Sequence, residues 1–298
     1  RNPYSGRYSG DVIRSLKIIN SLKKKFILDV VCLNSNNSII KEKNVVSFRN
    51  PSYFIKILNC LISLIKLRPI QFGLFVSREM KLYIENIADN YDYLFFYHIR
   101  SCQYLPKNFY GKSVLEMGDL YSDNYYQTFK NMNFFNPLKY IYLLESFLVK
   151  KEEDKIFSKF DRITLFAKKE ADKIKKKFKN KIFQIDESVE HVTKKFLFSK
   201  KNDKILFIGN LDYLPNFIAC RNFIKHVMPN LRKHLPEIKF RVIGNIGNIN
   251  RFLIPKNSNV ELLGVKKDLS KYLINSFCGL ANLEIATGVQ GKVLTYMS

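Results

Sequence analysis

The chain contains few of the residues that build disulfide frameworks or metal centres. Its five cysteines are scattered, most lie inside apolar runs, and no two form a C-x-x-C pair. Neither a disulfide framework nor a zinc site is therefore supported. The close aspartate pairs also lack D-x-D spacing. We expect a protein of a reducing, cytoplasmic compartment, and the sequence contains no motif that indicates a bound metal ion.

A long apolar run is also absent. The best candidate, residues 51–67, is interrupted by polar residues every three or four positions, so it is not suited to span a bilayer. These polar residues form one stripe along a helix, which Asn50 caps and Pro51 begins. The pattern predicts an amphipathic helix that either packs on a sheet or docks on a membrane face. The interrupting residues are Ser52, Lys56, Asn59, Ser63 and Lys66.

What the chain does contain is enough apolar sequence for two domains. It has 298 residues, of which 46% are hydrophobic, and short apolar strand patterns alternate with helical patterns. This alternation predicts an α/β protein whose parallel sheets are covered on both faces. The polar segment 198–203 favours a linker, so we divide the chain into residues 1–197 and 198–298. In the first domain the expected strands are 26–33, 44–48, 91–97, 113–117 and 162–166.

Basic residues are in large excess, with 50 Lys and Arg against 26 Asp and Glu and a net charge of +24. A nucleic-acid-binding protein usually concentrates such charge on one face or tail. Here the charge per residue is about equal in residues 1–200 and 201–298, so we expect no nucleic-acid partner. A composition typical of a low-GC genome explains the excess, and attraction to an anionic membrane surface is the functional alternative.

The most informative motif lies near the C-terminus. An apolar strand pattern at 277–283 is followed by a turn at Thr287 and Gly288 and then by a helical pattern. This order directs free backbone N–H groups at a ligand above the turn, which suits a phosphate. A second strand that ends in glycine, Lys204 to Gly209, begins the same segment. The pattern of this segment is therefore typical of one α/β domain that binds a nucleotide.

Several motifs together resemble those of a known family. They include I-L-F-I-G-N-L-D-Y-L-P-N (205–216), G-V-K-K-D-L-S-K-Y-L (264–273), G-V-Q-G-K-V-L (288–294), N-P-Y-S-G-R-Y-S-G-D-V-I-R (2–14) and L-E-M-G-D-L-Y-S-D (115–123). Over nearly its whole length the chain resembles the family 4 glycosyltransferases, and among them the bacterial sugar transferases of exopolysaccharide clusters, including the exosortase-associated group. The resemblance implies the GT-B fold, two Rossmann-like domains facing across a cleft. It also implies that the family's first strand and the end of its C-terminal domain are missing here.

The resemblance also implies a function. It is the retaining, metal-independent transfer of a sugar from a nucleotide-sugar donor to a cell-surface polysaccharide or lipid-linked acceptor, in the cytoplasm at the membrane face. Such enzymes stabilise the leaving diphosphate with helix N-termini and basic side chains. No cofactor is implied besides the donor substrate. The implied donor-binding residues are Gly10, Arg14, Gly209, Thr287, Gly288, Val289, Gln290, Lys292 and Thr295. For Arg14 the alternative is a side chain that faces solvent.

Two residues of the first domain are candidates for the chemistry. His98 follows the strand pattern 93–97, and in the family a histidine after such a strand often contacts a hydroxyl of the donor sugar. The alternative is a histidine that is satisfied by backbone groups. Asp119 and Asp123 flank the end of another strand, where open α/β sheets place ligands, or they cap a helix that starts near Asn124.

The chain departs from the family pattern in three places. Thr295 stands where members commonly carry a glutamate for the ribose hydroxyls, and Glu284 and Thr287 stand where the most similar subgroup carries arginines. Segment 210–216 contains no Lys or Arg, although many members place a basic pair there. These departures leave a second hypothesis open, a degenerate GT-B module that serves as a partner in a polysaccharide assembly complex.

Overall fold

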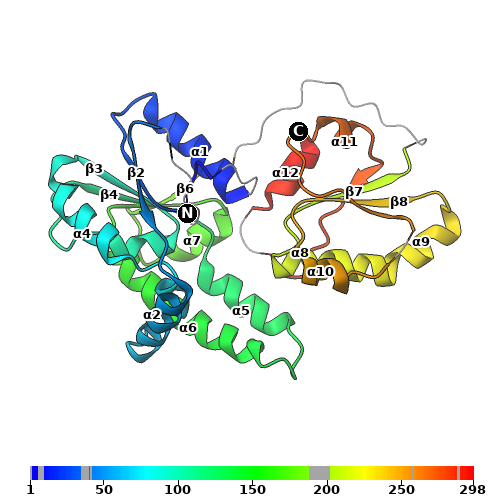
Figure 1. The fold of residues 1–298 in the computed structure, drawn as a ribbon, viewed down its shortest axis with the longest axis horizontal. Helices are drawn as coiled ribbons and strands as arrows, with labels where there is room; N and C mark the ends of the chain where they lie inside the picture. The colour runs from blue at the N-terminus through cyan, green and yellow to red at the C-terminus, as the bar shows by residue number, and fades with distance from the viewer. Residues whose placement is uncertain are drawn as a thin grey trace. The chain divides into compact units, whose positions relative to one another are not determined.

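The computed structural model describes residues 2–5, 10–34, 40, 42–187, 202–256, 258–286 and 289–298. They form two compact units (Figure 1). The first unit takes in the chain up to Asp186, and the second takes in nearly all of it from Glu187 onward. Every strand pair in the described residues is parallel, as the alternating pattern predicts. The expected boundary at 197 and 198 lies outside the described residues and stays a prediction.

The first unit contains a four-stranded sheet of order β3-β4-β5-β6 and a separate pair, β1-β2. The central strands β4 and β5 carry the core of this sheet, and Leu115, Met117, Ile163 and Leu165 are fully buried. The strands are β1 (Val30–Asn34), β2 (Val45–Arg49), β3 (Tyr93–Tyr97), β4 (Lys112–Gly118), β5 (Arg162–Leu165) and β6 (Ile182–Gln184). The helices are α1 (Gly10–Lys23), α2 (Tyr53–Ile65), α3 (Ile70–Gly73), α4 (Arg78–Ile87), α5 (Tyr121–Asn131), α6 (Leu138–Lys159) and α7 (Lys168–Lys175), with 3₁₀ turns η1 (Ala88–Asn90) and η2 (Ile99–Tyr104).

The five strands expected in the first unit are present with ends shifted by a few residues, whereas β6 was not expected. β6 is only three residues long and pairs with β5 alone, so its pattern is too short to stand out. The helix expected at 51–67 is α2, but Ser52 caps it rather than Asn50: the Ser52 Oγ accepts a hydrogen bond from the Ile55 N–H at 3.4 Å.

The orientation of α2 differs from that of a helix packed on a sheet. Its polar stripe is the side that faces the protein, since Ser63 is buried and Lys56 and Asn59 are half-buried. The apolar residues on its other sides are exposed. The prediction that an amphipathic helix forms is therefore confirmed. The prediction that it packs on a sheet through its apolar side is wrong.

The second unit contains a sheet of order β10-β7-β8-β9. In Figure 1, α8, α9 and α10 lie on one face of this sheet and α11 and α12 on the other. Phe207, Phe223 and Phe240 are at the centre of its core. The strands are β7 (Lys204–Ile208), β8 (Lys239–Ile243), β9 (Val260–Leu262) and β10 (Cys278–Gly279). The helices are α8 (Leu214–Asn222), the π-helical turn η3 (Phe223–Val227), α9 (Met228–His234), α10 (Asn248–Leu253), α11 (Ser270–Ile274) and α12 (Gly291–Met297).

Two segments of the second unit have local features of their own. The helical stretch from α8 to α9 is interrupted by the π-helical turn, which ends two residues before Pro229, whose nitrogen carries no hydrogen to donate. The segment 244–250 is held by the Asp212 carboxylate. That carboxylate accepts hydrogen bonds from the Gly247 N–H at 2.7 Å and from the Asn245 Nδ2 at 2.5 Å. No helix in the described part of the chain is long and apolar enough to cross a membrane.

Candidate active site

In the first unit, three adjacent strands bring candidate residues to one edge of the sheet. His98 directly follows β3, Asp119 follows β4, and Phe166 follows β5. Because the strands are parallel and neighbouring, these residues lie at the carboxyl edge, where α/β proteins bind ligands. Arg14 of α1 reaches the same edge, with its guanidinium carbon 4.3 Å from the centre of the Phe166 ring.

The backbone of His98 is strained and firmly held. Its φ is 67° and its ψ is 150°, a region that glycine adopts readily and other residues seldom do. The His98 N–H donates to the Glu116 carbonyl at 2.8 Å, and its carbonyl accepts from the Ser101 N–H at 3.0 Å and the Ser101 Oγ at 2.7 Å. Strain of this kind costs about 1–3 kcal/mol and is concentrated at functional sites.

The His98 ring is a neutral hydrogen-bonding group. Its Nδ1 lies 2.6 Å from the Tyr121 hydroxyl oxygen, and its Nε2 is buried without a partner among the described residues. Burial lowers the pKa of His98 to about 4, although the nearby Asp11 acts in the opposite direction. Burial also raises the pKa of Tyr121, which keeps that hydroxyl protonated. With Tyr121 donating to Nδ1, the ring carries its proton on Nε2 and can donate it to an oxygen of a ligand.

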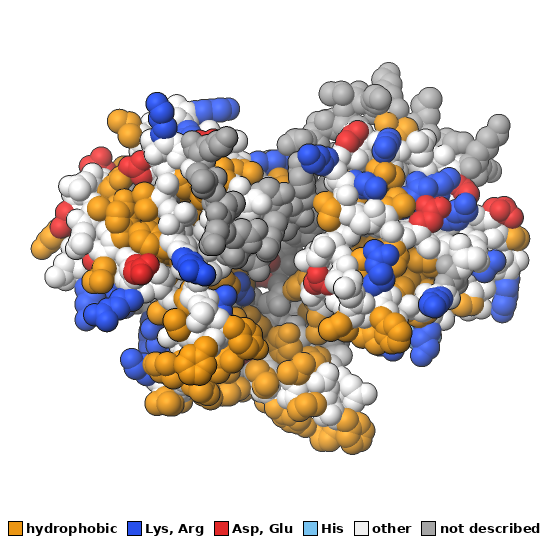
Figure 2. All heavy atoms as spheres, viewed as in Figure 1, with side chains coloured by type: hydrophobic (Ala, Val, Ile, Leu, Met, Phe, Trp, Pro, Cys, Tyr) orange, Lys and Arg blue, Asp and Glu red, His pale blue; other side chains and the backbone are white. Residues whose placement is uncertain are grey.

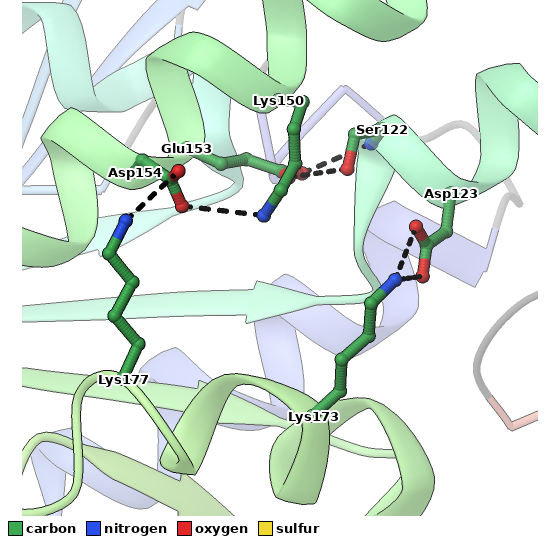
Figure 3. Close-up of polar contacts among 7 residues, drawn as sticks. All are labelled: Ser122, Asp123, Lys150, Glu153, Asp154, Lys173 and Lys177. Atoms are coloured by element: carbon green, nitrogen blue, oxygen red, sulfur yellow. Dashed lines mark hydrogen bonds and ion pairs between the residues drawn. The ribbon is translucent and has the colours of Figure 1, made fainter.

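The helix that carries Tyr121 is anchored by two buried carboxylates. Glu153 accepts from the Ser122 N–H at 3.1 Å and from the Ser122 Oγ at 2.5 Å, as Figure 3 shows. Glu170 accepts from the Leu120 N–H at 3.0 Å. These carboxylates compensate the positive end of α5 and fix the position of Tyr121. Burial raises the pKa of Glu153 to about 7.

The expected aspartate cap near Asn124 needs correction. The helix begins at Tyr121, three residues earlier. Asp123 instead forms an ion pair with Lys173, whose Nζ lies 2.7 Å from its Oδ2 (Figure 3). Asp119 is half-buried directly after Gly118, and its N–H donates to the Met117 carbonyl at 3.1 Å. Its position at the carboxyl edge is the one that the sequence predicted.

A second group of candidates lies in the second unit, around Lys292 of α12. The Lys292 Nζ lies 4.0 Å from the centre of the Phe207 ring and donates to the Asn216 Oδ1 at 2.6 Å. Burial lowers the pKa of Lys292 to about 8. A partly buried ammonium group of this kind is poorly hydrated, so a bound anion would gain a strong charge-assisted contact.

Tight packing explains the glycine, Gly209, that directly follows β7. A Cβ on Gly209 would lie 2.8 Å from the Asn216 Nδ2, and a Cβ on Gly244 would lie 1.8 Å from the Gly209 carbonyl oxygen. Asn216 in turn donates to the Asn210 carbonyl at 2.9 Å. Gly209 thus makes room for the side chain that positions Lys292.

The remaining donor candidates are distributed as follows. Thr287 and Gly288 lie outside the described residues. Val289 is half-buried before α12, and the carbonyl of Gln290 accepts from the Val293 N–H at 2.8 Å. The Thr295 hydroxyl donates to the Gly291 carbonyl at 2.9 Å within its own helix. Gly10 is the exposed first residue of α1, with open space where a Cβ would be.

A carboxylate lies at the start of α12. The Glu187 Oε1 lies 3.4 Å from where a Cβ on Gly291 would be. An anion that binds at this end of the helix would have to displace this like charge. In the described ranges, no group of three or more His, Cys, Asp or Glu side chains is arranged to hold a metal ion.

Sequence reasoning missed three residues that organise these sites. Tyr121 orients His98, Asn216 binds Lys292, and Asp212 holds the loop before α10. All three lie inside the motifs that carry the family resemblance, L-E-M-G-D-L-Y-S-D and I-L-F-I-G-N-L-D-Y-L-P-N. The signal was present, but a motif does not show which of its side chains meet.

Comparison with known structures shows the fold. The chain is GT-B, two Rossmann-like units of parallel sheet. HepE from Anabaena, solved with UDP and glucose, is similar with a TM-score of 0.53 and 12% identity over 92% of this chain and 71% of its own. OtsA, a trehalose-6-phosphate synthase, gives a TM-score of 0.53 and 10% identity over 95% of this chain and 76% of its own.

A third similar structure is that of TarM, with a TM-score of 0.50 and 16% identity over 72% of this chain. The chain spans only 41% of the length of TarM. No family model and no curated protein matches the sequence. The likeness to solved structures, at such low identity, establishes the fold.

Proposed function

We propose that the protein is a glycosyltransferase that moves a sugar from a nucleotide-sugar donor to a polysaccharide or lipid-linked acceptor. The observation that carries the proposal is His98: a strained backbone, a neutral ring and a buried Nε2 that has no partner among the residues that the structure describes, at the carboxyl edge of the sheet in a GT-B unit. The HepE structure, which contains UDP and glucose, supports a nucleotide sugar as the donor.

The reaction follows from the side chains. His98 would donate from Nε2 to a hydroxyl of the donor sugar and so hold the sugar for attack by the acceptor. Arg14 places a positive charge at the same edge, and Asp119 is the candidate for contact with the acceptor hydroxyl. No step calls for a metal ion, and we propose transfer with retention of configuration, as the family 4 resemblance implies.

For the donor nucleotide we propose the second unit. The diphosphate would lie over the segment from Thr287 to Gln290 and accept from Lys292. Lys292 would then exchange the Asn216 oxygen for a phosphate oxygen, and the Glu187 carboxylate would move away. Since Thr295 offers only a hydroxyl that is bonded within its own helix, we expect weak recognition of the ribose.

In the cell, we propose a role in exopolysaccharide synthesis on the cytoplasmic side of the membrane. The motifs resemble those of exopolysaccharide sugar transferases, and the net charge of +24 favours an anionic membrane surface.

Calorimetry with UDP, GDP and TDP tests the donor site. Lys292→Ala should raise the dissociation constant of the preferred nucleotide by about tenfold or more, because a charge-assisted hydrogen bond contributes about 1.5–3 kcal/mol. Lys225→Ala, which removes an exposed lysine of the same unit, should change it little. Equal affinities in the two variants would place the nucleotide elsewhere.

The degenerate-module hypothesis remains the second candidate. The observations that favour it are the Glu187 carboxylate at the start of α12 and the lack of Lys or Arg in segment 210–216. It predicts that the protein binds none of the three nucleotides, whereas a glycosyltransferase binds at least one.

A further inference from the structure

Helix α2 presents its apolar side to the outside of the protein. Phe54 and Ile65 are 77% and 81% exposed, and seven further large apolar side chains of the helix are exposed as well. The inward side consists of the polar or small residues Lys56, Asn59, Cys60 and Ser63. A surface helix of a globular protein shows the reverse pattern, with its apolar stripe turned to the core. The other exposed residues are Tyr53, Ile55, Ile57, Leu58, Leu61, Ile62 and Leu64.

The α5–α6 hairpin exposes a second apolar group around its tip. Phe135, in the turn between the helices, is 90% exposed. On α6, Tyr140, Leu144 and Phe147 recur at four- and three-residue spacing and therefore share one exposed face. The other exposed apolar residues of this group are Phe134, Leu138 and Ile141.

The two groups belong to one part of the first unit. The segment that follows α2 is bound to α6, because the Ile70 N–H donates to the Glu145 carboxylate at 2.9 Å and Arg68 pairs with Glu152 at 3.2 Å. Figure 2 shows hydrophobic side chains gathered over α2 and over the hairpin tip, at the same lower end of this unit. Apolar patches of this extent mark binding surfaces.

The exposed charges within the two groups have one sign. Residues 51–68 contain Lys56, Lys66 and Arg68 and no Asp or Glu. Residues 124–147 contain Lys130 and Lys139, and their one acidic residue, Glu145, is buried. Apolar and aromatic side chains bordered by Lys and Arg, without exposed carboxylates, are typical of segments that lie in the interface of an anionic bilayer.

We propose that the apolar faces of α2 and of the α5–α6 hairpin tip form a membrane-docking surface that inserts into an anionic lipid bilayer. The lipid headgroups attract the basic residues, and the acyl chains take up the exposed apolar side chains. A second copy of the chain is disfavoured as the occupant, because it carries the same net charge of +24 and the same basic border. The proposal gives the membrane role suggested above a specific surface, and it can be tested without any nucleotide or sugar.

Vesicle binding of the whole chain, measured without nucleotide, tests the surface. Vesicles that contain phosphatidylglycerol should bind the protein, and vesicles of phosphatidylcholine alone should bind it at least tenfold more weakly. Phe54→Ser combined with Phe135→Ser should weaken binding to the anionic vesicles by tenfold or more. Phe252→Ser, which removes an 87%-exposed aromatic ring from the second unit, should leave binding unchanged. All these side chains are exposed, so thermal unfolding should show every variant folded.

The absence of tryptophan from the chain allows a direct measurement of insertion. Phe135→Trp should give fluorescence that shifts to the blue on anionic vesicles and is quenched by brominated acyl chains, whereas Phe252→Trp should show neither effect. Equal vesicle binding by the double variant and the parent would overturn the proposal, as would an unquenched Trp at position 135. Self-association in sedimentation that the double variant abolishes, without vesicle binding by the parent, would assign the surface to a second copy instead.

Discussion

The Nδ1 atom of His98 lies 2.6 Å from the hydroxyl oxygen of Tyr121, and this contact joins the ends of two elements that are remote in sequence. His98 follows β3 with a strained backbone, and Tyr121 begins α5, whose N-terminus is held by Glu153 and Glu170. The contact fixes which nitrogen of the imidazole can face a ligand.

Removal of the Tyr121 hydroxyl should impair turnover more than binding. In Tyr121→Phe the His98 ring loses the partner that orients it, and we expect kcat to fall by about fivefold, since one such hydrogen bond is worth about 1 kcal/mol. The donor KM should change by less than about twofold, because we propose that the nucleotide binds in the second unit. Steady-state kinetics measure both, with Tyr126→Phe as the control for an exposed tyrosine of the same helix. An unchanged kcat would show that the contact is structural.

The backbone strain at His98 should lower the free energy of unfolding by a measurable amount. His98→Gly and His98→Ala both remove the imidazole, but only glycine adopts a φ of 67° without strain. We expect the glycine variant to be more stable than the alanine variant by about 1 kcal/mol or more in urea unfolding. Both variants should lose activity by about tenfold or more. A more stable alanine variant would show that the backbone is not strained there.

Glu153 should make the stability depend on pH. Burial raises the pKa of Glu153 from 4.5, the ordinary value of an exposed carboxyl, to about 7 in the folded protein. Between these values the folded state holds the proton more tightly than the unfolded state, so stability falls as pH rises, by an amount on the order of 3 kcal/mol. Glu153→Gln removes this pH dependence, and its Oε1 can still accept from the Ser122 N–H while its Nε2 donates to the Ser122 Oγ.

Urea unfolding at pH 5 and at pH 8 checks this dependence. The stability of Glu153→Gln relative to the parent should rise between the two pH values. For Glu85→Gln, which changes an exposed carboxylate of α4, the same difference should stay constant. A constant difference for Glu153→Gln would mean that the carboxyl ionises near its ordinary pKa.

Lys292 should lower the stability of the folded protein and strengthen its binding of the nucleotide. Burial lowers its pKa to about 8, so at pH 7 the folded protein holds a poorly hydrated charge. Lys292→Met keeps the contact with the Phe207 ring and removes the charge. We expect higher stability at pH 7 and nucleotide affinity reduced by about tenfold, measured by urea unfolding and calorimetry. Stability and affinity that both fall would point to a purely structural lysine.

Glu187 should oppose nucleotide binding. Its carboxylate lies at the start of α12, where we propose the diphosphate. Glu187→Gln should tighten UDP or GDP binding several-fold, with a larger effect at low salt, because the repulsion is electrostatic. Glu237→Gln, an exposed carboxylate of the same unit, is the control. Weaker binding in Glu187→Gln would indicate that the carboxylate helps to hold the ligand.

The fold could largely be predicted from sequence, because alternating apolar patterns and glycine turns record local structure. His98 and Asp119 could be placed at the carboxyl edge of the sheet for the same reason. The partner of His98 could not be found, since 23 positions separate it from Tyr121 and the contact depends on how β3 and β4 pair.

Periodicity also does not determine which side of an amphipathic helix faces the protein. The stripe of Lys56, Asn59 and Ser63 on α2 was visible in the sequence, but the pattern alone did not say that this stripe faces inward. Composition favoured an exposed polar side. The Glu145 carboxylate, which binds the backbone just after α2, is part of what holds it in this orientation.

The most direct test of the proposed function is the release of nucleoside diphosphate from a panel of UDP-, GDP- and TDP-sugars. We predict that the protein hydrolyses at least one donor slowly in the absence of acceptor, and that His98→Ala reduces the rate by about tenfold or more. A chain that hydrolyses none of the donors and binds no nucleotide, or one whose hydrolysis is undiminished in His98→Ala, would contradict the account.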